Sequence, residues 1–119
     1  MPLVRIDLDE SRDPQQRKAI SNGIHDAMIS AFGIPPGDRF QVITPHPADE
    51  LVFDPAFLGV ERTSVIFIQV ILVRRQTKEA KLAFYEDVAA RLAPAGVRKE
   101  DLFIALLENQ SEDWTAGQR

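Results

Sequence analysis

The stretch that decides the fold reads Thr63-Ser-Val-Ile-Phe-Ile-Gln-Val-Ile-Leu-Val-Arg74. Residues 65–73 are apolar except for Gln69, and most of them are β-branched. Such residues pack well on a pleated sheet, so we predict a strand over 63–74. Because its centre is apolar on both faces, both sides of that strand are expected to be covered.

An amphipathic helix is predicted before this strand and another after it. Asp13 followed by proline is typical of a helix N-cap and first turn. Apolar residues then recur every fourth position until Gly33, which predicts a helix over about 14–32. Thr77 caps a second helix, which is expected to run to about Ala93.

Further strands and a tail complete the prediction. Residues 2–8 alternate apolar and polar side chains, which indicates a half-buried strand. The pattern restarts at 40–44, and 101–107 resembles a closing strand. A short strand is expected at 51–53, inside a proline-rich segment, and the residues after Asn109 form a polar tail.

The chain contains an internal repeat. The apolar stripes of the two helices align at a constant offset of 64 residues, and Asp38-Arg-Phe aligns with Asp101-Leu-Phe at an offset of 63. The aligned helix positions are Ile20, Ile24 and Met28 with Phe84, Val88 and Leu92. Each half is therefore strand, helix, strand, and parallel strands joined by a helix form a right-handed crossover.

The repeat predicts one α/β (α+β) domain over 1–119, with halves at about 2–62 and 63–108 and a tail at 109–119. This tandem βαβ repeat gives a four-stranded sheet with both helices on one face. The other face lacks a cover within one subunit, so we expect a partner subunit to cover it. A monomeric sandwich of helices and sheet is the alternative.

Composition excludes several classes of function. The 119 residues carry a net charge of −4 and a pI of about 5.1, which argues against a nucleic-acid partner. There is no cysteine, and His25 and His46 have no supporting cluster, so no metal site is predicted. We expect His25 at the border of the first helix's buried face and His46 in a loop. With no membrane-length apolar run and no signal-peptide pattern, the expectation is a soluble cytoplasmic protein without a membrane partner.

Pro2 is the first candidate for chemistry. Proline lacks an N–H and suits the first residue of a strand, so the residue type alone indicates only structure. Removal of Met1 would leave a secondary amine on a rigid ring. Such an amine can carry a proton or act as a nucleophile without a cofactor.

Several motifs follow Pro2 in a defined order, and Arg74 ends the third strand. They are Ala31-Phe-Gly-Ile-Pro-Pro-Gly-Asp-Arg-Phe-Gln41, Glu50-Leu-Val-Phe, Phe84-Tyr, Ala105-Leu-Leu-Glu-Asn and Asp113-Trp. Together with the double βαβ repeat, they resemble the tautomerase superfamily and, within it, the malonate semialdehyde decarboxylase group. The resemblance covers nearly the whole chain, and chance does not easily explain its collinearity.

This resemblance implies a tautomerase-like fold, no cofactor, and a homotrimer that acts on a small carboxylate. Pro2 matches the amino-terminal proline that acts as acid or base, and Asp38 matches a loop aspartate placed near it. Arg74 matches the first of two arginines that bind the substrate carboxylate, and Trp114 matches a pocket wall supplied by the tail. From the residues alone, Asp38 is a turn residue and Trp114 anchors a tail.

The chain departs from the decarboxylase pattern at the second arginine. That position is Gln76, and an extra arginine stands at Arg75. On an extended strand 74 and 76 face one side and 75 the other, so Arg75 replaces the missing arginine only if the strand ends or bulges there. Gln76 donates a hydrogen bond but carries no charge, which weakens the case for decarboxylation more than for tautomerisation.

These observations predict a cofactor-independent tautomerase for 2-oxo or enol carboxylates, with Pro2 as acid and base. A malonate semialdehyde-type decarboxylase or a hydratase using the same site is the alternative. A non-catalytic trimeric binding protein is the third hypothesis, and it applies if Met1 is retained.

Overall fold

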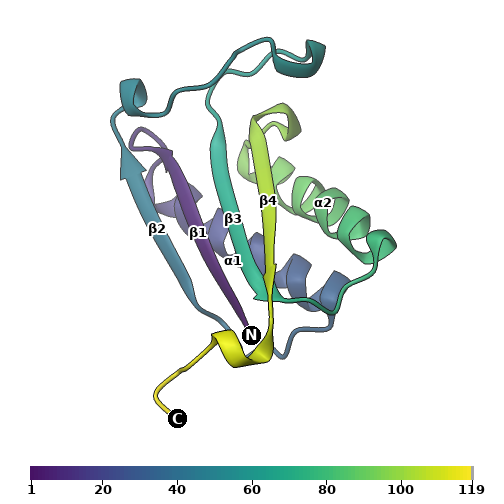
Figure 1. Cartoon of the computed structure of the whole chain (residues 1–119). Helices are drawn as coiled ribbons and strands as arrows, with labels where there is room; N and C mark the ends of the chain where they lie inside the picture. Colours follow the sequence, from purple (N-terminus) through teal and green to yellow (C-terminus); the bar gives the residue numbers. More distant parts are fainter. Residues whose placement is uncertain (119) are drawn as a thin grey trace.

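The computed structural model describes residues 1–118, in which a four-stranded sheet packs against two long helices (Figure 1). In chain order the elements are β1 (Pro2–Asp9), α1 (Pro14–Phe32), β2 (Gln41–His46), β3 (Ile66–Val73), α2 (Lys78–Leu92) and β4 (Leu102–Asn109). Single turns of 3-10 helix lie between and after them, including Ala48–Glu50, Phe57–Gly59 and Ser111–Asp113.

The strand order across the sheet is β2-β1-β3-β4. β1 pairs in parallel with β2, and β3 pairs in parallel with β4, whereas β1 and β3 are antiparallel. Each half of the chain is thus a βαβ unit, and both helices lie on the same face of the sheet (Figure 1). The predicted tandem repeat and its four-stranded sheet are confirmed.

Both long helices begin at the predicted caps. Oδ1 of Asp13 accepts a hydrogen bond from the backbone N–H of Gln16 at 2.8 Å, and Oγ1 of Thr77 accepts one from Ala80 at 3.1 Å. α1 ends at Gly33, whose φ of 66° is a left-handed conformation that glycine adopts at little cost.

The hydrophobic core lies between the helices and the inner face of β1 and β3. All six aligned helix positions of the repeat are buried there. The helices approach closely at Gly23, where an added Cβ would lie 2.6 Å from Cδ2 of Leu92. The other large buried side chains of the sheet are Val4, Ile6, Leu8, Ile66, Ile68 and Val70.

The bounds of β3 differ from the prediction. The backbone N–H groups of Thr63 and Ser64 donate to Oδ1 of Asp101, at 2.8 and 3.1 Å. Because a side chain takes these donors, pairing with β4 begins only at Ile66. The strand ends at Val73.

The short strand predicted at 51–53 is wrong. The segment between β2 and β3 leaves the sheet and loops above it (Figure 1), so these residues have no neighbouring strand with which to pair. His46 was also misplaced. It is the last residue of β2, opposite Asp9, and its Nε2 lies 2.7 Å from Oδ1 of Asp7.

Within residues 1–118, no helix covers the outer face of the sheet. Apolar side chains form two rows across the strands on this face, Leu3–Ile71–Leu107 and Phe67–Phe103. Arg5 and Gln69 form a polar row between them. Apolar area of this kind suits contact with another subunit, which stays a prediction. No helix within residues 1–118 combines the length and apolar character needed to cross a membrane.

Candidate active site

Pro2 is buried at the start of β1. It pairs with Leu72, and Leu3 pairs with Ile71, near the end of β3. The antiparallel contact between the two halves therefore brings the amino terminus to the same end of the sheet as Arg74, 72 positions later in the chain.

A cavity of about 330 Å³ opens beside Pro2. Its walls come from both ends of the chain and from the residue just before β2. The lining residues are Met1, Pro2, Leu3, Phe40, Trp114, Thr115 and Ala116. This volume is at the lower end of the range for small-molecule sites, roughly 300–1,000 Å³, and the mostly apolar lining fits a compact organic ligand.

A carboxylate lies next to the amino terminus, whose Met1 lines this cavity. The α-amino nitrogen of Met1 lies 3.6 Å from Oδ2 of Asp38, whose side chain is 23% exposed. Asp38 stands in the loop between α1 and β2, and its backbone N–H donates to the carbonyl of Pro35 at 2.9 Å. The structure thus brings Asp38 to the terminus that carries Pro2.

His25 fastens this loop to α1. Its Nε2 lies 2.9 Å from the carbonyl oxygen of Pro36, and because a carbonyl only accepts, Nε2 is the donor. The expectation of a border position was wrong, since His25 is only 4% exposed. Its Nδ1 is buried and has no hydrogen-bond partner among residues 1–118. Pro36 is two residues before Asp38, so this contact positions the carboxylate.

Arg39 fastens the other side of the same loop. Its Nη2 donates to Oγ of Ser21 at 2.8 Å and to Oδ1 of Asn22 at 2.7 Å, both on α1. Ser21 in turn donates to Oε1 of Gln41, the first residue of β2. Asp38 is therefore held between two anchored neighbours.

Trp114 reaches the cavity from the carboxyl-terminal tail. After β4 the chain makes a single turn at Ser111–Asp113 and returns toward the amino terminus. The indole Nε1 donates a hydrogen bond of 2.6 Å to Oδ1 of Asn109, the last residue of β4. The indole thereby forms one wall beside Pro2.

Arg74, Arg75 and Gln76 lie near this end of the sheet but not in the cavity wall. The backbone N–H of Arg74 donates to the carbonyl of Asn109 at 2.9 Å. Within residues 1–118, the three side chains make no hydrogen bond or ion pair, and both arginines are exposed. Because β3 ends at Val73, the alternation of a strand does not determine the side on which Arg75 lies.

Other hollows lie away from the amino terminus, including one of about 350 Å³ beside Asp13 and Gln16. One of about 450 Å³ lies between α2 and β4, beside Arg62 and Tyr85, and one of about 220 Å³ lies beside Phe67 and Phe103. We assign the candidate site to the cavity beside Pro2, because the amino terminus and an indole line it and the Asp38 carboxylate lies next to that terminus.

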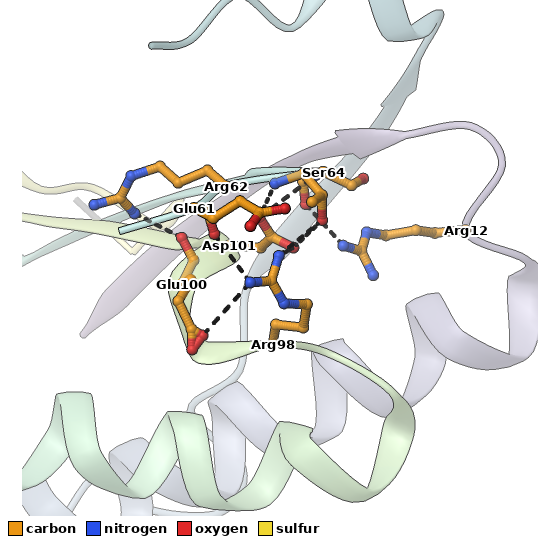
Figure 2. A network of polar contacts seen from close by, with 8 residues as sticks. Arg12, Glu61, Arg62, Ser64, Arg98, Glu100 and Asp101 are labelled. Carbon is orange, nitrogen blue, oxygen red and sulfur yellow. Dashed lines mark hydrogen bonds and ion pairs between the residues drawn. The ribbon is translucent and has the colours of Figure 1, made fainter. Parts of the chain in front are cut away.

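A polar network at the opposite end of β3 has a structural role (Figure 2). Nη2 of Arg12 donates to the carbonyl of Ser64 at 2.7 Å, and Nη1 of Arg98 lies 3.7 Å from Oδ2 of Asp101. Burial opposes ionisation of Asp101, but hydrogen bonds from Thr63 and Ser64 and the charge of Arg98 outweigh it. The pKa of Asp101 therefore falls below its ordinary 3.8.

The described part of the chain, 1–118, holds no group of three or more His, Asp or Glu side chains placed to bind a metal ion.

Comparisons with known proteins show the family of this chain. Two family models, each described as a tautomerase enzyme, match the chain over residues 38–117 and 2–60. The chain belongs to the tautomerase family. The probable tautomerase YusQ of Bacillus subtilis is 42% identical to this chain, and the match covers 98% of this chain and 94% of YusQ. The probable tautomerase YrdN of the same organism is 32% identical, and the match covers 98% of this chain and 92% of YrdN.

Solved structures of this family share the fold. A crystal structure of the FG41 malonate semialdehyde decarboxylase inhibited by 3-bromopropiolate matches with a TM-score of 0.92 and 40% identity, over 97% of this chain and 88% of the other. Another malonate semialdehyde decarboxylase, described with decarboxylase and hydratase activities, matches with a TM-score of 0.90 and 34% identity, over 98% and 91%. The chain is thus an enzyme of the tautomerase family.

Sequence reasoning did not single out several residues of this site. Phe40 and Thr115 line the cavity, and His25 and Asn109 hold parts that form it. Asn109 stood in a recognised motif, but nothing in its pattern indicated a partner five residues later.

Proposed function

We propose that this tautomerase-family enzyme moves a proton on a small 2-oxo or enol carboxylate, with Pro2 as its acid and base. One observation carries the proposal. The amino end of the chain, with Pro2, lines a small, mostly apolar cavity, and the Asp38 carboxylate lies 3.6 Å from the α-amino nitrogen of Met1. A proton carrier and a charge partner are thereby placed where a compact substrate fits.

Removal of Met1 is a condition of this chemistry. With Met1 attached, the nitrogen of Pro2 is an amide and cannot accept a proton. Met1 also lines the cavity, so its loss would both free the secondary amine and widen the space beside it. An intact-mass measurement of the natively expressed protein tests this condition. Retention of Met1 would instead support a non-catalytic binding protein.

The environment of Pro2 has two opposing effects on its amine. Apolar walls such as Phe40 and Trp114 disfavour the ammonium form, whereas the nearby Asp38 carboxylate favours it. A group balanced in this way can both take and return a proton near neutral pH.

Ketonisation of an enol such as phenylenolpyruvate illustrates the proposed step. The enol hydroxyl loses its proton, the C=C bond becomes a C–C bond as C=O forms, and the adjacent carbon gains a proton. Pro2 carries the proton between the two positions. Arg74, with Arg75 beside it, binds the carboxylate and stabilises the developing enolate, because a guanidinium stays charged and can contact both oxygens.

Kinetics of phenylenolpyruvate ketonisation test these roles. Pro2→Ala is expected to lower kcat by about 10²- to 10⁴-fold, the usual contribution of a general acid–base group. Arg74→Ala is expected to raise KM more than it lowers kcat, because it removes binding common to the ground and transition states. Full activity of Pro2→Ala would refute the mechanism.

Decarboxylation of a β-keto acid such as malonate semialdehyde is the second candidate. It is favoured by the two malonate semialdehyde decarboxylases that are 40% and 34% identical to this chain. In this reaction the bond to the carboxylate carbon breaks, carbon dioxide leaves, and the electron pair moves toward a carbonyl or an iminium formed with Pro2. The remaining α-carbon then takes a proton.

Two experiments separate the candidates. Borohydride treatment during turnover would leave a modified amino terminus if an iminium forms. Gln76→Arg would supply the charge that the decarboxylase pattern has at this position, and we expect it to raise kcat/KM for decarboxylation relative to ketonisation. Addition of water near Asp38, a hydratase activity, is a third possibility for the same site.

We also propose that the chain assembles as a homotrimer through the outer face of its sheet. The apolar rows on that face support an interface, and the number three comes from the family resemblance. Light scattering at micromolar concentration should give three times the 13.4 kDa of one chain. A monomeric mass would contradict the assembly.

A further inference from the structure

Asn109 stands between the two segments that would form the substrate pocket. Its carbonyl oxygen accepts the backbone N–H of Arg74 at 2.9 Å, and its side-chain Oδ1 accepts the indole N–H of Trp114 at 2.6 Å. Asn109 is thus hydrogen-bonded both to Arg74, the proposed carboxylate anchor, and to Trp114, which forms a wall of the cavity beside Pro2.

Three other hydrogen bonds of the described tail residues, 110–118, are local. The backbone N–H groups of Gln110, Ala116 and Gly117 donate to side chains within the tail itself. These local bonds shape the turn but do not tie it to the sheet. The bond from Trp114 to Asn109 does so, because Asn109 is the last residue of β4.

We propose that Asn109 is a positioning residue that sets substrate affinity by holding Trp114 against the cavity beside Pro2. This inference rests on the proposed function for its kinetic part. An indole N–H that is half-buried needs an acceptor, and the amide oxygen supplies one at the end of a rigid strand. Without that acceptor the indole leaves the wall, and the cavity opens toward solvent.

The chain contains a single tryptophan, so its fluorescence reports on Trp114 directly. Asn109→Leu keeps the approximate volume but removes the acceptor, and it should increase acrylamide quenching and shift the emission to longer wavelength. Asn109→Asp keeps an oxygen acceptor and should retain wild-type quenching. Glu112→Gln in the same tail is the matched control, because Glu112 is exposed and makes no hydrogen bond among the described residues.

A double-mutant cycle tests the kinetic part. Asn109→Leu should raise KM for phenylenolpyruvate about two- to tenfold with little change in kcat, as expected for one lost hydrogen bond that acts on binding. Trp114→Phe keeps an aromatic wall but has no N–H to donate. In that background Asn109→Leu should have no further effect, because its partner is already gone.

Unchanged quenching in Asn109→Leu, or an equal rise in KM in the Trp114→Phe background, would overturn this inference. Circular dichroism and the Tm of each variant separate a loss of the fold from a local change. If the wild-type protein has no ketonisation activity, the proposed function is wrong and Asn109 has no kinetic role in it, while the fluorescence still decides whether Asn109 holds Trp114.

Discussion

The α-amino nitrogen of Met1 lies 3.6 Å from Oδ2 of Asp38, across 37 positions of the sequence. After loss of Met1 the new terminus is Pro2, one residue further along β1, a step of at most about 3.6 Å. Asp38 is therefore placed to influence the charge of the Pro2 amine.

Asp38→Asn should lower kcat for ketonisation about tenfold to hundredfold, because the amide no longer stabilises the ammonium form that returns the proton. Steady-state kinetics of protein with Met1 removed give the measurement. Asp49→Asn, in the exposed turn after β2, is the control and should have wild-type kcat. A wild-type rate for Asp38→Asn would mean that this carboxylate has no part in proton transfer.

His25→Leu should lower both kcat and the Tm, because the Pro36 carbonyl loses its donor and the Asp38 loop loses an anchor. The lost hydrogen bond is worth about 0.5–1.5 kcal/mol in the free energy of unfolding, because Pro36 is exposed and its carbonyl can bind water instead. His25→Gln retains a donor and should recover part of kcat. Equal kcat values for Leu and Gln variants would show that the hydrogen bond does not position the loop.

The stability of the protein should depend on pH through Asp101. Its pKa is below 3.8 in the folded protein, so its carboxylate stabilises the fold fully above that value. This contribution is lost as the pH falls from 3.8 through the lower folded-state pKa. Chemical unfolding of Asp101→Asn between pH 2 and pH 6, roughly the acidic range of a carboxyl group, should therefore show a flatter profile than wild type. Asp49→Asn is the control, and a profile equal to wild type for Asp101→Asn would contradict this role.

Gly23→Ala should destabilise the protein by about 1–3 kcal/mol, because the new Cβ would lie 2.6 Å from Cδ2 of the fully buried Leu92. Urea unfolding measures the change. Gly37→Ala is the matched control, since its Cβ would meet nothing within 4 Å and its φ is not positive. A wild-type midpoint for Gly23→Ala would mean that the helices separate at no cost.

Leu107→Asp should dissociate the proposed trimer, because it places a charge in the apolar row Leu3–Ile71–Leu107 on the outer sheet face. Light scattering gives the mass. Leu82→Asp, on α2 and 50% exposed, is the control and should keep the assembly. A trimeric mass for Leu107→Asp would place the interface elsewhere.

The sequence by itself determined the elements and their order. Asp13, Thr77 and Gly33 specify helix ends through local hydrogen bonds and backbone conformation, which depend on neighbours in the chain. Both helices carry apolar residues at every fourth position, which is the spacing that buries one helix face. Because this stripe occurs twice at a constant offset, the sequence predicted two βαβ units. The short motifs that follow Pro2 in a defined order also predicted the tautomerase family.

Only the tertiary structure decided what those elements bring together. The antiparallel pairing of β1 with β3 places Pro2 opposite Leu72 and hence near Arg74. The Asp101 carboxylate accepts the backbone N–H groups of Thr63 and Ser64, so β3 begins only at Ile66. The segment at 51–53 has strand-forming residues but no neighbour, and a strand needs one for its hydrogen bonds. Contacts between distant residues depend on how whole elements pair and pack, which local composition does not encode.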